Sequence, residues 1–285
     1  MSNRSKRAAI AQETINILDN GYYQNNLGEI VSIKESLHNA ITNSALYPPE
    51  SFRNVFAKRD NKLQSNNRFE TVFEVESETT LHAVKRLLDE GLNDVLCLNF
   101  ASAKNPGGGF LGGSQAQEES LARASGLYPC ISQMQAMYQT NRNFHSCLYT
   151  DYMIYSPLVP VFRDDDDALL QIPYHVSVIT APAVNVGALK QQKSKDIGRT
   201  QSVMLARTEK VLSLAVIQDH ENLVLGAWGC GVFKNDPSDV ANYFHHHLTE
   251  NPMFKGAFKK IVFAVFGKEK DESNIKPFRE AFLNA

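Results

Sequence analysis

The sequence predicts an α/β fold in which a largely parallel sheet is covered by helices on both faces. From about residue 68 onward, short apolar runs alternate with stretches of helical periodicity. The apolar runs are nearly continuous, which is typical of strands buried on both faces. Two of these runs lead into glycine-rich segments, and ligands bind beyond the carboxyl ends of strands in such sheets.

The N-terminal part, residues 1–67, is expected to be a helical extension that precedes the main domain at 68–285. Glycine at 21 is a natural stop for the first helix. Between the helices the chain is expected to be irregular. The expected segments are a helix at 4–20, a short helix at about 34–46 and an exposed polar connection at 59–67.

In the main domain, residues 69–75 alternate between apolar and polar side chains as a half-buried strand does. The order of the remaining segments predicts strands that alternate with helices. Strands are expected at 95–100, 151–155, 175–181, 222–228 and 260–266, and helices at about 80–90, 117–125, 197–217, 237–248 and 273–283.

Composition narrows the class of protein. The chain has 285 residues, of which 43% are hydrophobic, enough for one substantial core with an N-terminal elaboration. A formal net charge of −2 argues against dedicated duplex nucleic-acid binding. The four cysteines are scattered, as expected for reduced thiols in a cytoplasmic protein. We expect neither a membrane span nor a secretory signal.

The most informative segment is 107–119, where a glycine run precedes two adjacent carboxylates. Gly107, Gly108 and Gly109 permit positive φ angles and let a ligand approach without a Cβ in the way. Gln117-Glu118-Glu119 then stands where a helix is expected to begin. First-turn glutamates often only complement the helix dipole. However, five glycines within 107–113 indicate a loop that is shaped for a ligand.

A second glycine segment follows the predicted strand at 222–228. Gly229-Cys230-Gly231-Val232-Phe233 leads into a helix that begins near Ser238. Backbone N–H groups of such a turn suit a phosphate, although a plain strand-to-helix turn is the structural alternative. The Gly-Lys-Ser/Thr pattern of a Walker phosphate site is missing. Phosphoryl transfer therefore fits poorly, and a glycosidic bond is the more attractive target.

Both motifs resemble those of a known family. The catalytic loop of microbial-type poly(ADP-ribose) glycohydrolases is similar to Asn99-Phe100-Ala101-Ser102 running into Gly107-Gly108-Gly109, with Gln117-Glu118-Glu119 after a seven-residue gap. The diphosphate loop of the macrodomain fold that these enzymes share resembles Gly229–Phe233. The resemblance covers roughly 70–270. It implies a three-layer α/β/α macrodomain-like mixed sheet, preceded by the helical extension of microbial members.

The resemblance also implies roles for individual residues. Glu119 would be the general acid that protonates the departing ribose hydroxyl and then the base that activates water, and Glu118 would hold ribose hydroxyls. Ser102 stands where macrodomains and the larger animal glycohydrolases commonly have a second asparagine, and it can still bond to ribose. The other expected substrate-binding residues are Asn99, Gly107, Gly108, Gly109, Gln117, Gly229, Cys230, Gly231, Val232 and Phe233.

The predicted activity is hydrolysis of ribosyl-ribose bonds in poly(ADP-ribose), releasing ADP-ribose, by a monomer without cofactor or metal. Such cleavage passes through an oxocarbenium-like state that needs leaving-group protonation and water, which a glutamate of raised pKa could supply. Removal of single ADP-ribose units from protein or nucleic acid, non-catalytic reading of ADP-ribose and binding of another nucleotide remain alternatives. Adenine is expected near Glu76 or Glu78. His245-His246-His247 and Asp164–Asp167 are expected to be a helix face and a solvated loop rather than metal sites.

Overall fold

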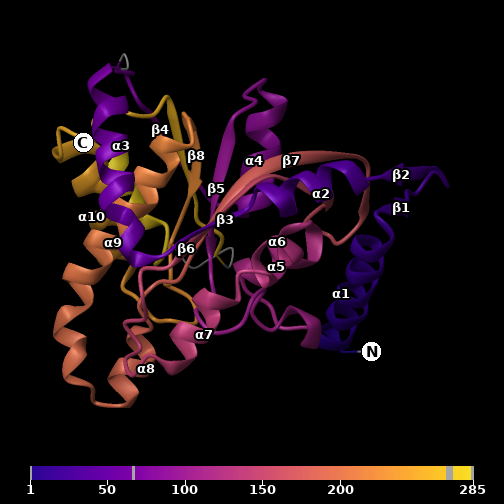
Figure 1. Cartoon of the computed structure of the whole chain (residues 1–285), viewed down its shortest axis with the longest axis horizontal. Helices are drawn as coiled ribbons and strands as arrows, with labels where there is room; N and C mark the ends of the chain where they lie inside the picture. Colours follow the sequence, from indigo (N-terminus) through magenta and orange to yellow (C-terminus); the bar gives the residue numbers. More distant parts are fainter. Residues whose placement is uncertain (1, 66–67, 268–271, 284–285) are drawn as a thin grey trace.

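The computed structural model describes residues 2–65, 68–267 and 272–283, and it places a seven-stranded mixed sheet between layers of helices (Figure 1). Five parallel strands are neighbours, and the other two lie together at one edge, where one strand runs antiparallel to both of its neighbours. In spatial order the strands are β3 (Ala45–Tyr47), β6 (Met153–Arg163), β7 (Leu169–Ala181), β5 (Val95–Phe100), β8 (Asn222–Leu225), β9 (Lys260–Ala264) and β4 (Val72–Glu76).

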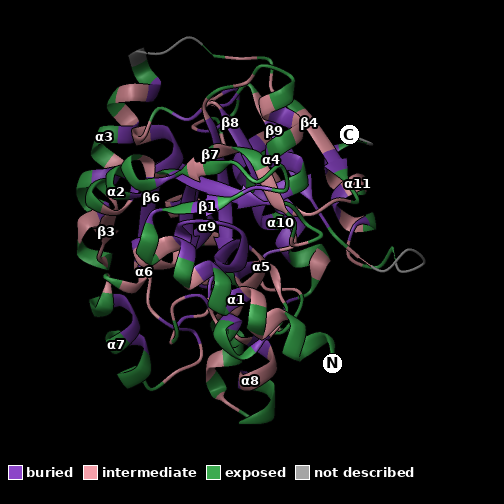
Figure 2. Ribbon diagram, turned by 90° about the vertical axis from the view of Figure 1, so that its right-hand side faces the viewer, coloured by how far each residue is buried: buried purple, intermediate pink, exposed green. Residues whose placement is uncertain are grey.

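Central strand β5 shows why helices cover both faces of the sheet. Successive strand side chains point to opposite faces, and Leu96 and Leu98 belong to one buried cluster while Val95 and Cys97 belong to another. Figure 2 shows these buried strands between the more exposed outer surfaces of the helices. The first cluster includes residues of α3 (Phe52–Ser65), α9 (Thr200–Ile217), α10 (Pro237–His245) and α11 (Lys276–Phe282), and the second includes residues of α2 (Lys34–Asn43), α4 (Thr80–Asp89), α5 (Gln117–Ala124), α6 (Leu127–Ser132) and α7 (Gln135–Asn143).

The predicted α/β class and mixed sheet are confirmed, and so is the first helix. Helix α1 (Asn3–Asn20) ends at Gly21, which has φ 76° and whose N–H bonds to the carbonyl oxygen of Ile17. A small hairpin follows, made of β1 (Tyr22–Gln24) and β2 (Ile30–Ser32). None of the described helices has the length and apolar character of a membrane span.

The expectation of an exposed connection at 59–67 is wrong for its described part. Residues 52–65 form α3, and the Arg59 side chain is buried. Its guanidinium group pairs with Glu209 at 2.8 Å and donates to Ser213 Oγ. The polar residues of 59–65 indicated a surface loop, because the partners that allow Arg59 to be buried lie about 150 residues away in α9. Residues 66–67 lie outside the described part.

The N-terminal segment also contributes to the sheet. Its strand β3 pairs antiparallel with β6, and α3 contacts α9. The segment thus contains short strands as well as helices, while the boundary at 67/68 stays a prediction about domain organisation. Sequence periodicity also missed α6 and α7, and it placed only the start of β6, which runs on to Arg163.

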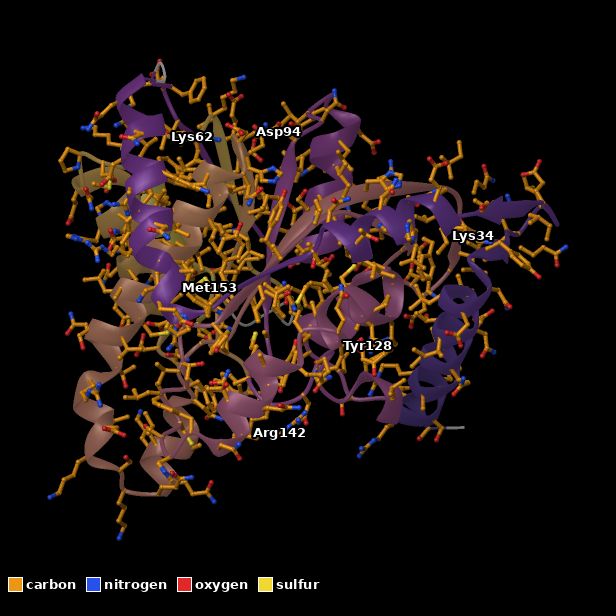
Figure 3. All side chains as sticks on the ribbon, viewed as in Figure 1. Lys34, Lys62, Asp94, Tyr128, Arg142 and Met153 are labelled. Carbon is orange, nitrogen blue, oxygen red and sulfur yellow. The ribbon has the colours of Figure 1, made fainter. Side chains whose placement is uncertain are left out.

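The sheet brings the two glycine segments to the same edge. β5 and β8 are parallel neighbours, so the loops that follow both strands leave at the carboxyl edge of the sheet. Asp94 precedes β5 at the opposite edge, where it bonds to Glu221 N–H and to Asn222 (Figure 3). The glycine loops therefore lie at the carboxyl edge of the sheet, and the Asp94 hydrogen bonds lie at the opposite edge.

Candidate active site

The first glycine loop approaches the carboxylates so closely that a side chain would not fit. Gly107 and Gly108 have φ angles of 71° and 59°, in the left-handed region that favours glycine. A Cβ on Gly108 would lie 2.4 Å from Glu119 Oε1. Any other residue here would strain the backbone and displace the Glu119 carboxylate.

Glu119 is held through one of its carboxylate oxygens. The N–H of Gly109 donates to Glu119 Oε1 at 3.0 Å. Glu119 Oε2 has no hydrogen-bond partner within the described residues. That oxygen is buried, while the Glu119 residue as a whole lines the cavity, so the acid stands at the cavity wall.

Glu118 has a different environment, because only 3% of it is exposed. The N–H of Ser102 donates to Glu118 Oε2 at 2.6 Å, and Asn99 Nδ2 donates to Oε1 at 3.3 Å. Burial raises the pKa of Glu118 to about 8, an effect that these hydrogen bonds oppose and the neighbouring Glu119 reinforces. The raised pKa favours the protonated form of Glu118 near neutral pH. The acid with the raised pKa is the one that the resemblance assigns to ribose hydroxyls.

Gln117 fixes the start of α5 against the sheet. Its Oε1 accepts from the N–H of Phe100 at 2.8 Å, and its Nε2 donates to the carbonyl oxygen of Leu98 and to Thr80 Oγ1. The amide group is thus occupied by strand β5 and helix α4. Gln117 sets the position of both following glutamates, although the residue also lines the cavity.

Hydrogen bonds from Asn235 hold the second glycine loop in place. Gly229 has φ 76°, and its carbonyl oxygen accepts from both the backbone N–H and the Nδ2 of Asn235. Asn235 Nδ2 also donates to the carbonyl oxygen of Val184 at 2.8 Å. Burial raises the pKa of the Cys230 thiol to about 12, so the loop carries no thiolate charge at neutral pH. The Phe233 ring lies 5.9 Å from that of Tyr149.

Both loops line one cavity of about 1560 Å³. Two predicted site residues are absent from its lining: Asn99 is fully buried behind Glu118, and Gly107 adjoins the rings of Phe110 and Tyr128. The structure brings together in the lining Ser102, Gly108, Gly109, Gln117, Glu118, Glu119, Gly229, Cys230, Gly231, Val232 and Phe233.

The cavity also contains residues that the sequence did not single out. Phe266 lies two residues after the end of β9. It lines the cavity and is 70% exposed. Its signal was an aromatic residue at the carboxyl end of a predicted strand. Of the two acids considered for adenine, Glu78 lines the cavity and Glu76 does not. Glu78 is paired with Arg86 at 2.8 Å.

Asp164, Asp165 and Asp166 are exposed, as expected of a solvated loop, and the acidic loop Asp164–Asp167 also lines the cavity. Asp165 accepts a hydrogen bond from Thr79 Oγ1 at 2.6 Å. The histidine run lies elsewhere, and His247 Nε2 bonds to the carbonyl oxygen of Leu205. Across the described ranges, no group of three or more His, Cys, Asp or Glu side chains is placed to hold a metal ion.

Helix α1 packs directly on the end of the first glycine loop, which forms the short helix η2 (Phe110–Gly112). Arg4 Nε and Arg7 Nε donate to the carbonyl oxygens of Gly112 and Gly113, each at 2.9 Å. A Cβ on Gly113 would lie 2.0 Å from the backbone oxygen of Arg4. The first helix of the chain is therefore part of the wall behind the catalytic loop (Figure 1).

Comparisons with known proteins agree with this geometry. A family model described as the catalytic domain of microbial-type PARG, poly(ADP-ribose) glycohydrolase, matches residues 11–164. A search of curated proteins finds no match. Among solved structures, the chain resembles the poly(ADP-ribose) glycohydrolase of Thermomonospora curvata at 41% identity with a TM-score of 0.91, covering 98% of this chain and 100% of that one.

Two further structures contain a ligand. The Thermomonospora curvata enzyme bound to the inhibitor ADP-HPD is similar at 41% identity, with a TM-score of 0.88 and coverage of 98% and 100% of the two chains. The Deinococcus radiodurans enzyme in complex with ADP-ribose is similar at 41% identity, with a TM-score of 0.80 and coverage of 87% and 97%. The family match and these near-complete alignments show that the chain belongs to the microbial-type poly(ADP-ribose) glycohydrolase family.

Proposed function

We propose that the chain hydrolyses the ribosyl-ribose bonds of poly(ADP-ribose) and releases ADP-ribose. One observation carries the proposal: Glu119, held by the Gly109 N–H, lines the cavity beside the largely buried Glu118, and the second glycine loop lines the same cavity. The similar structures with ADP-ribose or an inhibitor bound support the same substrate class.

In the proposed reaction, Glu119 acts at the anomeric carbon of the distal ribose. Its carboxylic acid gives a proton to the bridging oxygen as the bond from the anomeric carbon to that oxygen breaks. The resulting carboxylate then takes a proton from the water that attacks the same carbon. The hydrogen bond from the Gly109 N–H to Oε1 fixes the orientation of this carboxyl group at the cavity wall.

The other residues hold the substrate on either side of this centre. Protonated Glu118 would bind ribose hydroxyls without adding negative charge beside the reacting oxygen. The backbone N–H groups of 229–233 would hold the diphosphate, because they belong to a concave turn that precedes helix α10. The exposed ring of Phe266 would stack on the adenine base, at the end of the cavity that Glu78 also lines. We expect the enzyme to act as a cytoplasmic monomer.

The test is release of ADP-ribose from purified poly(ADP-ribose), with wild type beside Glu119→Gln. We expect the variant to lose about 10²- to 10⁴-fold in rate, the range that general acid–base catalysis supplies. Titration calorimetry should show that it still binds ADP-ribose. Release at a near wild-type rate would make the assignment of Glu119 wrong. ADP-ribose binding without polymer cleavage by wild type would instead favour single-unit hydrolysis or a reader.

A further inference from the structure

The cavity is larger than the usual pocket for one small ligand. Pockets that enclose a single small-molecule ligand measure roughly 300–1,000 Å³, whereas this cavity measures about 1560 Å³. Beyond Glu119 it continues over the flank of α5, past Ser120 and Arg123. This additional space lies between helix α1 and the acidic loop Asp164–Asp167, both of which line it.

One face of α1 forms a wall of the additional space. Asn3, Lys6 and Ile10 line the cavity and recur every three or four residues, so they share one side of the helix. Arg7, which also lines the cavity, lies beside them. We call these four residues the α1 wall.

The α1 wall is held in place by contacts of the adjoining face of the helix and of Arg7 itself. Ala11 is fully buried with Phe110 of the glycine loop, and Thr14 Oγ1 donates to the carbonyl oxygen of Arg123 at 2.6 Å. Arg4 and Arg7 bond to the loop through their Nε atoms. The wall therefore has a fixed position relative to Glu119, because the same loop donates to that acid.

The α1 wall is cationic and has spare hydrogen-bond donors. Lys6 is exposed and, within the described residues, has no ion-pair partner. Arg7 uses Nε for the carbonyl oxygen of Gly113, and its two terminal nitrogens have no partner in the described part of the chain. Ammonium and guanidinium groups are suited to phosphate oxygens.

We propose that the α1 wall is a subsite for the diphosphate of the polymer unit on the leaving side of the scissile bond. The inference rests on the proposed function. Glu119 protonates the oxygen of that unit, so the unit must occupy space that adjoins Glu119, and the α1 side of the cavity is such space. Lys6 and Arg7 would meet its phosphates, while the carboxylates of Asp164–Asp167 on the other wall can accept from its hydroxyl groups.

The test compares two substrates that differ only on the leaving side. One is poly(ADP-ribose), and the other is the 4-nitrophenyl glycoside of ADP-ribose, whose leaving group carries no phosphate. For each variant the measured quantity is the ratio of kcat/KM for the polymer to kcat/KM for the glycoside. We expect Lys6→Glu to lower this ratio about five- to tenfold, because an attraction between exposed charges becomes a repulsion.

Lys195→Glu is the matched control. Lys195 is exposed and begins the short helix η3 (Lys195–Arg199). This helix follows α8 (Val186–Gln191), which Figure 1 shows well apart from α1. For Lys195→Glu, the ratio of kcat/KM for the polymer to kcat/KM for the glycoside should equal that of wild type. A ratio for Lys6→Glu within about twofold of wild type, with thermal unfolding unchanged, would overturn the subsite. Failure of wild type to cleave either substrate would instead overturn the proposed function itself.

Discussion

Two adjacent glutamates have different environments because of where their side chains lie on α5. Glu118 is turned into the sheet, where Ser102 and Asn99 meet its two oxygens. Glu119 lines the cavity, with one oxygen fixed by Gly109 and the other buried without a partner among the described residues. A neutral acid beside a reactive one divides binding and proton transfer between two neighbouring residues.

The raised pKa of Glu118 predicts a dependence of stability on pH. Its pKa rises from 4.5 in the unfolded chain to about 8 in the folded protein, so between these values the folded state binds more protons. The free energy of unfolding should therefore fall as pH rises from about 4.5 to about 8. We expect Glu118→Gln to remove this dependence and to raise the Tm relative to wild type near the upper end of that range.

Glu35→Gln is the control, since Glu35 also stands second in its helix but is exposed. Thermal unfolding followed by circular dichroism across the pH range makes the comparison. If the difference in Tm between Glu118→Gln and wild type stayed constant with pH, the burial argument would be wrong. Wild-type kcat/KM should also decline above about pH 8, where Glu118 loses its proton.

A substitution at Gly108 gives a second prediction, in which the effect of backbone strain on stability can be separated from the effect of displacing Glu119 on activity. Gly108→Ala adds a Cβ 2.4 Å from Glu119 Oε1 at a φ of 59°. We expect a loss of about 1–2 kcal/mol in stability from the left-handed backbone. Activity should fall about 10²-fold because the acid is displaced.

Gly91→Ala is the matched variant, because Gly91 has φ 89° and nothing within 4 Å of an added Cβ. It should lose comparable stability and keep its activity. If both variants cleaved the polymer at the same rate, the predicted displacement of Glu119 by the Gly108→Ala side chain would be wrong.

Among the elements, α1 acts on the site without touching the carboxylates. It bonds to the carbonyl oxygens of Gly112 and Gly113, and the same loop supplies the Gly109 N–H that holds Glu119. The helix is therefore a positioning element, and a change on it should alter the catalytic step more than the binding of ADP-ribose.

Arg4→Ala tests the role of the helix. The variant loses one hydrogen bond to Gly112, which contributes about 0.5–1.5 kcal/mol. We expect kcat to fall about two- to tenfold at nearly unchanged affinity for ADP-ribose, and Arg4→Lys to recover part of the loss. Arg53→Ala, at an exposed position of α3, is the control. A change in affinity alone, with kcat intact, would contradict the positioning role.

Local patterns predicted much of the element order and both glycine loops. Strand alternation, apolar runs and capping residues act within a few positions, so they can be read from sequence. Helix α3 was missed because Arg59 gains its partners about 150 residues away. The cavity wall formed by Lys6 and Arg7 was missed for the same reason, since only the folded chain brings α1 to residues 112–113.

For the whole molecule, the N-terminal segment is continuous with the rest. β3 extends the sheet at β6, α3 contributes Phe52 and Val55 to the core under α9, and α1 supports the catalytic loop. The buried core therefore includes residues from both sides of the predicted boundary at 67/68. The mixed sheet supplies a rigid frame, and the functional groups come from loops at one edge and from the first helix.

The contacts between α1 and residues 112–113 also have a consequence for folding. The two bonds join positions 106 and 108 residues apart. The loss of chain entropy on closing a loop grows only with the logarithm of its length. Closing a segment this long therefore costs little more free energy than closing a segment half as long. Contacts of high sequence separation nevertheless slow folding. We therefore expect the catalytic loop to reach its final geometry late, after the central strands have paired, so that recovery of activity is the last sign of the native state.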